Sequence, residues 1–194
     1  DNIKGICIYP DGEALISTAT IEEIRNALNR FKQSGKFIVA YDYYYSQSDY
    51  YLASVADEII LNPEGSLDWY GMATTNIFIK GMLDKLGISV EVFRPTSCKF
   101  KSAVEPFIRT NMSDADRKQN QAMIDSIWQG ICEDIAASRG KNIEELKHIA
   151  ATLSAAFPND ALNVGMIDTV AHEDYLFEVY DNYGVKRNDD GLFN

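Results

Sequence analysis

The chain has 194 residues, of which 18 are Lys or Arg and 29 are Asp or Glu, so its net charge is −11. Hydrophobic residues make up 46% of the sequence and charged residues 24%, which is the composition of a folded globular domain and not of a disordered segment. The negative charge excludes a nucleic-acid-binding surface, which needs clustered Lys and Arg. It also argues against docking on anionic lipid headgroups.

The start of the sequence has no initiator Met and no secretory leader: Asp1 is followed almost at once by a strand-like run, Ile3–Tyr9. The longest apolar runs, such as Phe37–Tyr41, are far shorter than the roughly 20 residues that a membrane-spanning helix needs. We therefore expect this chain to be a soluble fragment of a longer protein.

The first 62 residues alternate between strand and helix patterns. The first helix pattern opens with a capping box, Thr20 to Glu23, and ends near Gly35. Pro63 closes the third strand pattern. Short connections between alternating elements predict a parallel sheet with right-handed crossovers. The patterns predict strands over residues 3–9, 37–41 and 58–62, with helices over 20–35 and 50–56.

The second part of the sequence is mainly helical. Ser113 opens a long helix pattern that ends at Gly140. No linker and no repeat divides the chain, so we predict one α/β domain over residues 1–185 and a polar tail over 186–194. The other patterns predict helices over residues 78–86, 143–150, 159–164 and 172–183, with strands over 88–93 and 166–170.

Several kinds of chemistry lack a sequence signal. The glycine-rich motifs that hold dinucleotides and nucleotide phosphates are absent. The two histidines, His148 and His172, lie in charged helix patterns, so a Ser-His-Asp triad has no support. Cys7 and Cys132 fit core positions, and Cys98 fits a loop. We expect no cofactor and no metal ion.

One unusual segment runs from Tyr41 to Ser54, from the end of a predicted strand into a helix, and is rich in tyrosine. The carboxyl ends of parallel strands are where sites form, and a helix start offers free N–H groups. Exposed aromatic residues equally favour a packing surface between subunits. The pattern leaves both interpretations open.

A second unusual segment, Phe93–Phe107, carries Lys99 and Lys101 among apolar and small residues. Burial among such neighbours would favour an uncharged amine, which can act as a general base. A loop lysine is more often a solvated surface charge. The adjacent Ser102 resembles a nucleophile, but neighbouring side chains in an extended chain point to opposite sides.

The run Lys101–Phe107, with Ser113 opening the next helix, closely resembles the signal peptide peptidase A family, also called protease IV. The resemblance is to the amino-terminal repeat of the long, two-repeat form. It extends from Ile3 to about Tyr183 and includes Tyr50–Asp57 and the turn Gly165–Asp168.

The resemblance implies a ClpP/crotonase-like α/β fold, with a mainly parallel sheet and surrounding helices, and a Ser–Lys catalytic dyad. Lys101 matches the catalytic lysine, which acts as the general base. The nucleophilic serine lies in the second repeat, and the matching position here is Gln47, flanked by Ser46 and Ser48. A fragment with only the lysine is expected to be inactive.

The resemblance also implies the biological setting. The substrates are signal peptides, and the partners are the carboxy-terminal repeat of the same protein and further copies in a homo-oligomer. The full-length protein lies in the bacterial inner membrane and faces the periplasm. Nucleic acid is not a partner.

Two alternatives remain from the residues themselves. The same fold serves crotonase-type acyl-CoA enzymes, in which paired backbone N–H groups bind a thioester oxyanion and Glu64 would be the base. The chain could equally be a non-catalytic scaffold repeat, in which Lys101 is structural and the tyrosines form an interface.

Overall fold

The computed structural model describes residues 3–10, 17–93, 95 and 100–186. The chain divides into two compact units: unit 1 contains residues 1–71 and 131–194, and unit 2 contains residues 72–130. The single domain over residues 1–185 stays a prediction. Of the polar tail over 186–194, only Lys186 lies within the described residues.

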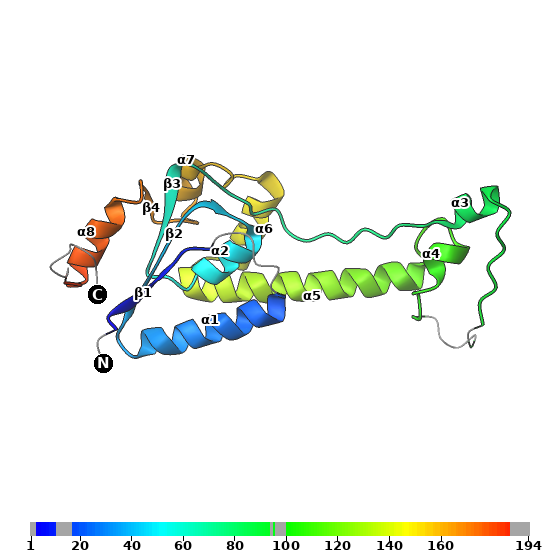
Figure 1. The fold of residues 1–194 in the computed structure, drawn as a ribbon, viewed down its shortest axis with the longest axis horizontal. Helices are drawn as coiled ribbons and strands as arrows, with labels where there is room; N and C mark the ends of the chain where they lie inside the picture. Colours follow the sequence, from blue (N-terminus) through cyan, green and yellow to red (C-terminus); the bar gives the residue numbers. More distant parts are fainter. Residues whose placement is uncertain (1–2, 11–16, 94, 96–99, 187–194) are drawn as a thin grey trace. The chain divides into compact units, whose positions relative to one another are not determined.

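Unit 1 is built on a four-stranded parallel sheet with strand order β1-β2-β3-β4. Two helices connect its first three strands, and consecutive strands are neighbours, so the chain winds in one direction across the sheet. The α/β class with a mainly parallel sheet is therefore confirmed (Figure 1). The elements are β1 (Gly5–Ile8), α1 (Thr18–Gln33), β2 (Phe37–Tyr45), α2 (Gln47–Ala53), β3 (Glu58–Leu67) and β4 (Thr169–Val170).

Both faces of the sheet are covered, which explains the uninterrupted apolar runs in β2 and β3. Alternate side chains of a strand point to opposite faces. Phe37, Val39 and Tyr41 pack with Leu176 and Val179 of α8 (Tyr175–Asn182). The alternate residues point to the opposite face, where α1 and α2 lie (Figure 1); those residues, all fully buried, are Ile38, Ala40, Ile59 and Leu61.

Several predicted boundaries in this unit are wrong, and α2, for example, runs over Gln47–Ala53 and not over residues 50–56. Helix α1 starts at Thr18 with Ser17 as its cap, because the Ser17 hydroxyl accepts the Thr20 N–H at 3.3 Å, so the capping box at Thr20 does not form. Strand β2 continues through the tyrosines to Tyr45, and β3 continues past Pro63 to Leu67. The extension of β3 begins at a register shift in its pairing with β2, where a proline is tolerated.

The rest of unit 1 is helical, as predicted. Helix α5 (Asp114–Arg139) begins in unit 2 and enters unit 1 at Ile131. It is followed by α6 (Ile143–Thr152), α7 (Pro158–Asn163) and α8. Cys132 is buried in α5, and this burial raises the pKa of its thiol to about 11. Cys7, in β1, is partly buried and its pKa is also raised by burial.

Unit 2 consists of α3 (Lys80–Lys85), α4 (Glu105–Ile108) and the first part of α5, joined by extended chain. The strand predicted over residues 88–93 is wrong. The described residues of this unit form no strand, so the alternating pattern has no sheet to join there.

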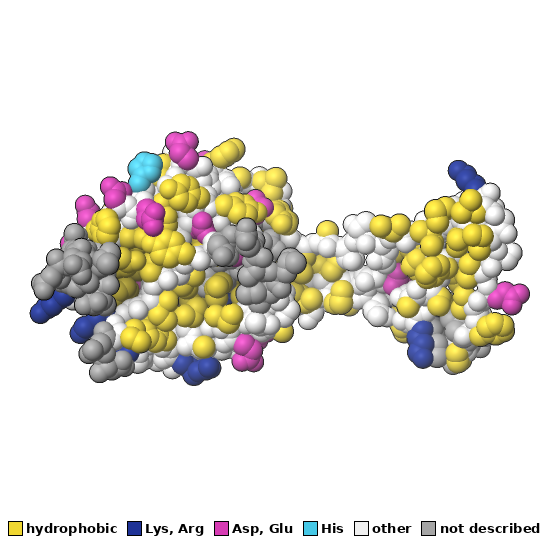
Figure 2. All heavy atoms as spheres, viewed as in Figure 1, with side chains coloured by type: hydrophobic (Ala, Val, Ile, Leu, Met, Phe, Trp, Pro, Cys, Tyr) yellow, Lys and Arg dark blue, Asp and Glu magenta, His cyan; other side chains and the backbone are white. Residues whose placement is uncertain are grey.

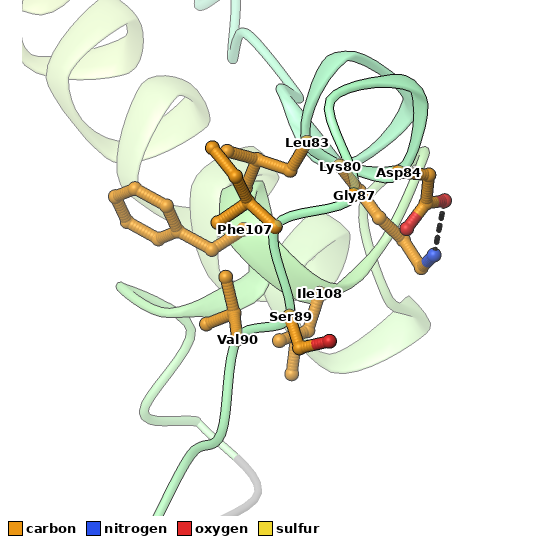
Figure 3. A pocket seen from close by; sticks show the side chains of 9 residues that line it. Lys80, Leu83, Asp84, Gly87, Ser89, Val90, Phe107 and Ile108 are labelled. Atoms are coloured by element: carbon orange, nitrogen blue, oxygen red, sulfur yellow. Dashed lines mark hydrogen bonds and ion pairs between the residues drawn. The ribbon is translucent and has the colours of Figure 1, made fainter.

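Much of the apolar surface of unit 2 is uncovered by the described residues. Ile77 is 77% exposed and Phe93 is 93% exposed, and Figure 2 shows apolar side chains gathered around α3 and α4. A pocket of about 470 Å³ lies between these helices, with Leu83 and Phe107 on its wall and the Lys80–Asp84 ion pair beside it (Figure 3). None of the helices described here has both the length and the hydropathy to cross a membrane.

Candidate functional site

Lys101 lies in unit 2 at the start of the turn that leads into α4, and its side chain is exposed. The backbone directly after it is ordered by hydrogen bonds. The carbonyl of Ser102 accepts the N–H of Glu105 at 2.8 Å, and the carbonyl of Val104 accepts the N–H of Phe107 at 3.1 Å. The turn therefore holds the main chain beside Lys101 and leaves the amine on the surface of this chain.

A buried carboxylate joins this turn to the long helix. Glu105 is only 2% exposed. Its Oε2 accepts the backbone N–H of Ser113 at 2.9 Å, and its Oε1 accepts the Ser113 hydroxyl at 2.6 Å. The Ser113 Oγ in turn accepts the N–H of Asp116 at 3.1 Å, which caps the start of α5. The helix start predicted at Ser113 is confirmed.

The same turn is tied to the segment before α3. The carbonyl of Pro106 accepts the N–H of Ile79 at 2.8 Å. The turn after Lys101 is thus fixed at two places, through Glu105 to α5 and through Pro106 to α3. The acidic residue in the Lys101–Phe107 run consequently has a clear structural role, which is to hold the turn next to the lysine. Lys99 and Cys98 lie outside the described residues.

Gln47 lies in unit 1 at the first residue of α2, and its carboxamide is hydrogen-bonded on both sides. Its Oε1 accepts the backbone N–H groups of Tyr70 and Gly71 at 3.2 and 2.9 Å. Its Nε2 donates to the carbonyl of Gly71 at 3.1 Å. The side chain of Gln47 therefore binds the backbone that follows β3.

The serines beside Gln47 have different surroundings. Ser46 is the N-cap of α2: its hydroxyl accepts the Asp49 N–H at 3.2 Å, while Asp49 Oδ2 accepts the Ser46 N–H at 3.2 Å. This reciprocal pair is a capping box, so the Ser46 hydroxyl is engaged in starting the helix. Ser48 is exposed in the first turn of the helix.

The tyrosine segment separates into core and surface residues. Tyr45 and Tyr50 are fully buried, and their hydroxyls donate to the carbonyls of Ile60 at 3.1 Å and Met166 at 2.8 Å. Tyr43 and Tyr44 are 56% and 42% exposed. The sequence showed one aromatic run, but the register shift between Asp42 and Tyr44 interrupts the alternation along β2, and the chain then turns into α2, which carries Tyr50.

Tyr44 is fixed on the surface by Asp68. Its hydroxyl donates to Asp68 Oδ2 at 2.7 Å, and this bond, followed by partial desolvation, raises the pKa of Tyr44 to about 12. Tyr70, which is 60% exposed, interacts electrostatically with Tyr44. An exposed aromatic surface therefore lies close to the backbone that Gln47 binds.

The residues considered for an acyl-CoA site, a catalytic triad or a metal site do not lie together in one site. Glu64 is exposed on β3, where its backbone N–H is bonded to the Asn62 side chain at 2.9 Å. His148 and His172 are exposed in separate parts of unit 1. Within the part of the chain that the structure describes, no group of three or more His, Cys, Asp or Glu side chains could hold a metal ion.

The sequence patterns did not reveal two side-chain contacts that the structure shows, those of Gln47 and Arg25. Gln47 and Gly71 are 24 positions apart in the sequence, and no local sequence pattern indicates that they are in contact. Arg25 is only 2% exposed, although charged side chains are seldom buried. Its long, polar side chain reaches groups on other helices, which a periodicity of apolar residues cannot reveal.

Known proteins resemble this chain over most of its length. The chain is 39% identical over 145 residues to Protease 4 of Salmonella typhi, and this match covers 75% of the chain and 23% of that protein. It is 30% identical over 128 residues to a chloroplastic serine protease of Arabidopsis thaliana named SPPA, covering 66% of the chain and 19% of that protein. The chain thus spans at most about a quarter of the length of these relatives.

Among solved structures, a mutant of a membrane-bound stomatin-specific protease aligns with a TM-score of 0.44 and 14% identity, covering 84% of this chain and 62% of that one. The sequence profile of peptidase family S49 matches residues 30–185, which include the Lys101 turn, Gln47 and the whole of unit 2. The chain belongs to peptidase family S49.

Proposed function

We propose that this chain is the amino-terminal repeat of a Ser–Lys serine endopeptidase, and that it supplies Lys101 as the general base while a second repeat supplies the serine. The family match and the names of the relatives support a peptidase. The observation that carries the role of Lys101 is its position: an exposed amine on a turn that the buried Glu105 fixes to α5.

The proposed chemistry is acyl transfer to a serine. Lys101 is exposed in this chain, so the second repeat would have to bury its amine to favour the uncharged form. The uncharged Nζ then takes the proton of the serine hydroxyl while the serine oxygen attacks the scissile carbonyl. The resulting ammonium then protonates the leaving amine, which leaves an acyl-enzyme ester. Water hydrolyses this ester in the same way, with the lysine again taking and returning one proton.

The resemblance in sequence supports signal peptides as substrates, in a protein of the bacterial inner membrane that faces the periplasm. Such peptides are apolar and extended, and would bind by strand addition. The uncovered apolar residues of unit 2, such as Ile77 and Phe93, support burial against the second repeat or against other copies in a homo-oligomer.

The test is substitution of Lys101 in the full-length protein. Lys101→Ala is expected to lower kcat at least about 100-fold, since a general base contributes roughly 10²- to 10⁴-fold. Lys101→Arg is expected to be equally inactive, because a guanidinium stays protonated. Lys118→Ala, an exposed lysine on α5, is the matched control and keeps full activity.

The scaffold alternative makes a different prediction for the same variants. If Lys101 is structural, Lys101→Ala lowers the melting temperature together with activity. If Lys101 is the base, the melting temperature stays within about 2 °C of the parent's, as for other exposed substitutions. Unchanged turnover by Lys101→Ala would overturn the proposed role.

A further inference from the structure

The carboxamide of Gln47 bonds to the backbone of residues 70–71, just beyond the paired ends of β2 and β3. The last paired residues are Tyr45 and Leu67, and the N–H of Asp68 still donates to the carbonyl of Tyr45 at 2.9 Å. The main chain then turns into α2, and the side chain of Gln47, the first residue of that helix, makes the next hydrogen bonds. Its Oε1 and Nε2 bond to the N–H and the carbonyl of Gly71.

A carboxamide carries the same donor and acceptor as a peptide group. One that bonds to both the N–H and the carbonyl of a single residue uses the two groups through which that residue would bond to the backbone of a bound peptide. The Gln47 side chain thus occupies the N–H and the carbonyl of Gly71, which are the two groups that a bound peptide would use. The segment is not sealed inside the fold, because Tyr70 is 60% exposed and Gln47 and Gly71 are partly exposed.

We propose that residues 70–71 form a binding edge for an extended peptide, and that Gln47 keeps this edge closed in the present chain. The inference deepens the proposed function, because it explains how a repeat that supplies the base avoids binding substrate itself. A serine at position 47 would be too short to reach Gly71 and would leave its N–H and carbonyl available. Replacing serine by glutamine therefore removes a nucleophile and also fills a peptide site.

The surroundings of this edge suit an apolar or aromatic peptide. Tyr44 and Tyr70 are both exposed there, and the bond from Tyr44 to Asp68 fixes one ring in place. Aromatic rings offer large contact areas at a small cost in conformational entropy. Backbone bonds to Gly71 would supply the register, and the two rings would contact the side chains of the peptide.

The experiment measures peptide binding to the full-length protein in a Lys101→Ala background, which prevents cleavage. The probe is a fluorescein-labelled decapeptide of Leu, Ala and Phe, titrated against the parent and against the additional variants Gln47→Ala and Gln47→Ser. We expect each variant to bind one more peptide per chain than the parent. Gln33→Ala, an exposed glutamine at the end of α1, is the matched control and should bind the same number as the parent.

Amide hydrogen exchange at residues 70–71 is the second measurement, since it remains informative if a variant is less stable elsewhere. Loss of the Gln47 bonds should speed exchange there about tenfold, and added peptide should restore protection. Unchanged exchange would overturn the inference, and so would faster exchange without an additional bound peptide. Cleavage of the probe by the Lys101→Ala parent would contradict the proposed role of Lys101 instead, and the exchange data would then decide the inference about Gln47.

Discussion

The buried carboxylate of Glu105 accepts two hydrogen bonds from Ser113, one from the backbone N–H at 2.9 Å and one from the hydroxyl at 2.6 Å. Eight residues separate the two in sequence, and between them the chain forms α4 and turns into α5. This pair sets the distance between the turn that carries Lys101 and the start of the long helix. It supports the turn that carries the lysine.

Glu105→Ala should therefore affect both stability and activity. We expect a loss of about 2–4 kcal/mol in unfolding free energy, because bonds to a charged group contribute roughly 1.5–3 kcal/mol each and are not additive. The kcat of the full-length protein should fall by up to about 100-fold as the turn loosens. Urea unfolding and peptide hydrolysis are the measurements.

Two further variants complete that experiment. Glu105→Gln keeps one carbonyl acceptor and should fall between the parent and Glu105→Ala in both measurements. Glu91→Ala removes an exposed carboxylate from the same unit and should leave both unchanged. Equal effects of Glu105→Ala and Glu91→Ala would show that the pair does not hold the turn.

Arg25→Met should strongly destabilise unit 1. The Arg25 guanidinium donates to the carbonyl of Tyr51, to Ser54 and, at 3.1 Å, to the hydroxyl of Ser138, and it lies 4.3 Å from the centre of the Tyr51 ring. It thus joins α1, α2 and α5, and its removal breaks these links, although the Ser54 hydroxyl still donates to the Tyr51 carbonyl at 2.9 Å. We expect a loss of about 3 kcal/mol.

The control for Arg25 is on the same helix. Arg30 is exposed, and Arg30→Met should change the unfolding free energy by less than about 0.5 kcal/mol. Urea denaturation of the two variants gives the comparison. A loss from Arg25→Met as small as that from Arg30→Met would mean that the bonds to α2 and α5 add nothing to stability.

Tyr50→Phe tests the contact between α2 and the segment before β4. The Tyr50 hydroxyl donates to the carbonyl of Met166 at 2.8 Å in a fully buried site. Removing it leaves a buried carbonyl unsatisfied, so we expect a loss of about 1–3 kcal/mol. Tyr43→Phe, on an exposed tyrosine, should be nearly neutral; thermal unfolding distinguishes the two.

The buried thiol of Cys132 leads us to expect that the folded chain loses stability at high pH. Burial raises its pKa from the ordinary value of 9.0 to about 11, so the folded chain favours the protonated thiol. The stability that this provides is complete below about pH 9 and is lost as the pH rises toward about 11, because the unfolded thiol ionises first. Cys132→Ala should therefore lose less stability than the parent between about pH 8 and pH 10.5.

Urea midpoints at those two pH values test this expectation. The tyrosines ionise in the parent and in Cys132→Ala alike, so their contribution cancels in the comparison. An identical pH dependence in both proteins would show that the buried thiol does not contribute.

Two local signals predicted their elements correctly, although the capping box expected at Thr20 does not form. The apolar runs of β2 and β3 specify buried parallel strands, and Ser113 specifies the start of α5, because both signals depend on neighbours close in sequence. The strand predicted over residues 88–93 failed for the converse reason. Alternation fits a strand only if a partner strand is present, and unit 2 offers none among its described residues.

The same distinction between local signals and long-range contacts applies to the candidate site. The sequence alone determined the family, through the run from Lys101 to Phe107, and with it the lysine proposed as the base. Only the tertiary structure decided that Glu105 is a buried support and that Gln47 binds the backbone of Gly71. Each of these contacts joins segments that the chain brings together by folding, so hydrogen-bond geometry in three dimensions, and not local pattern, determines them.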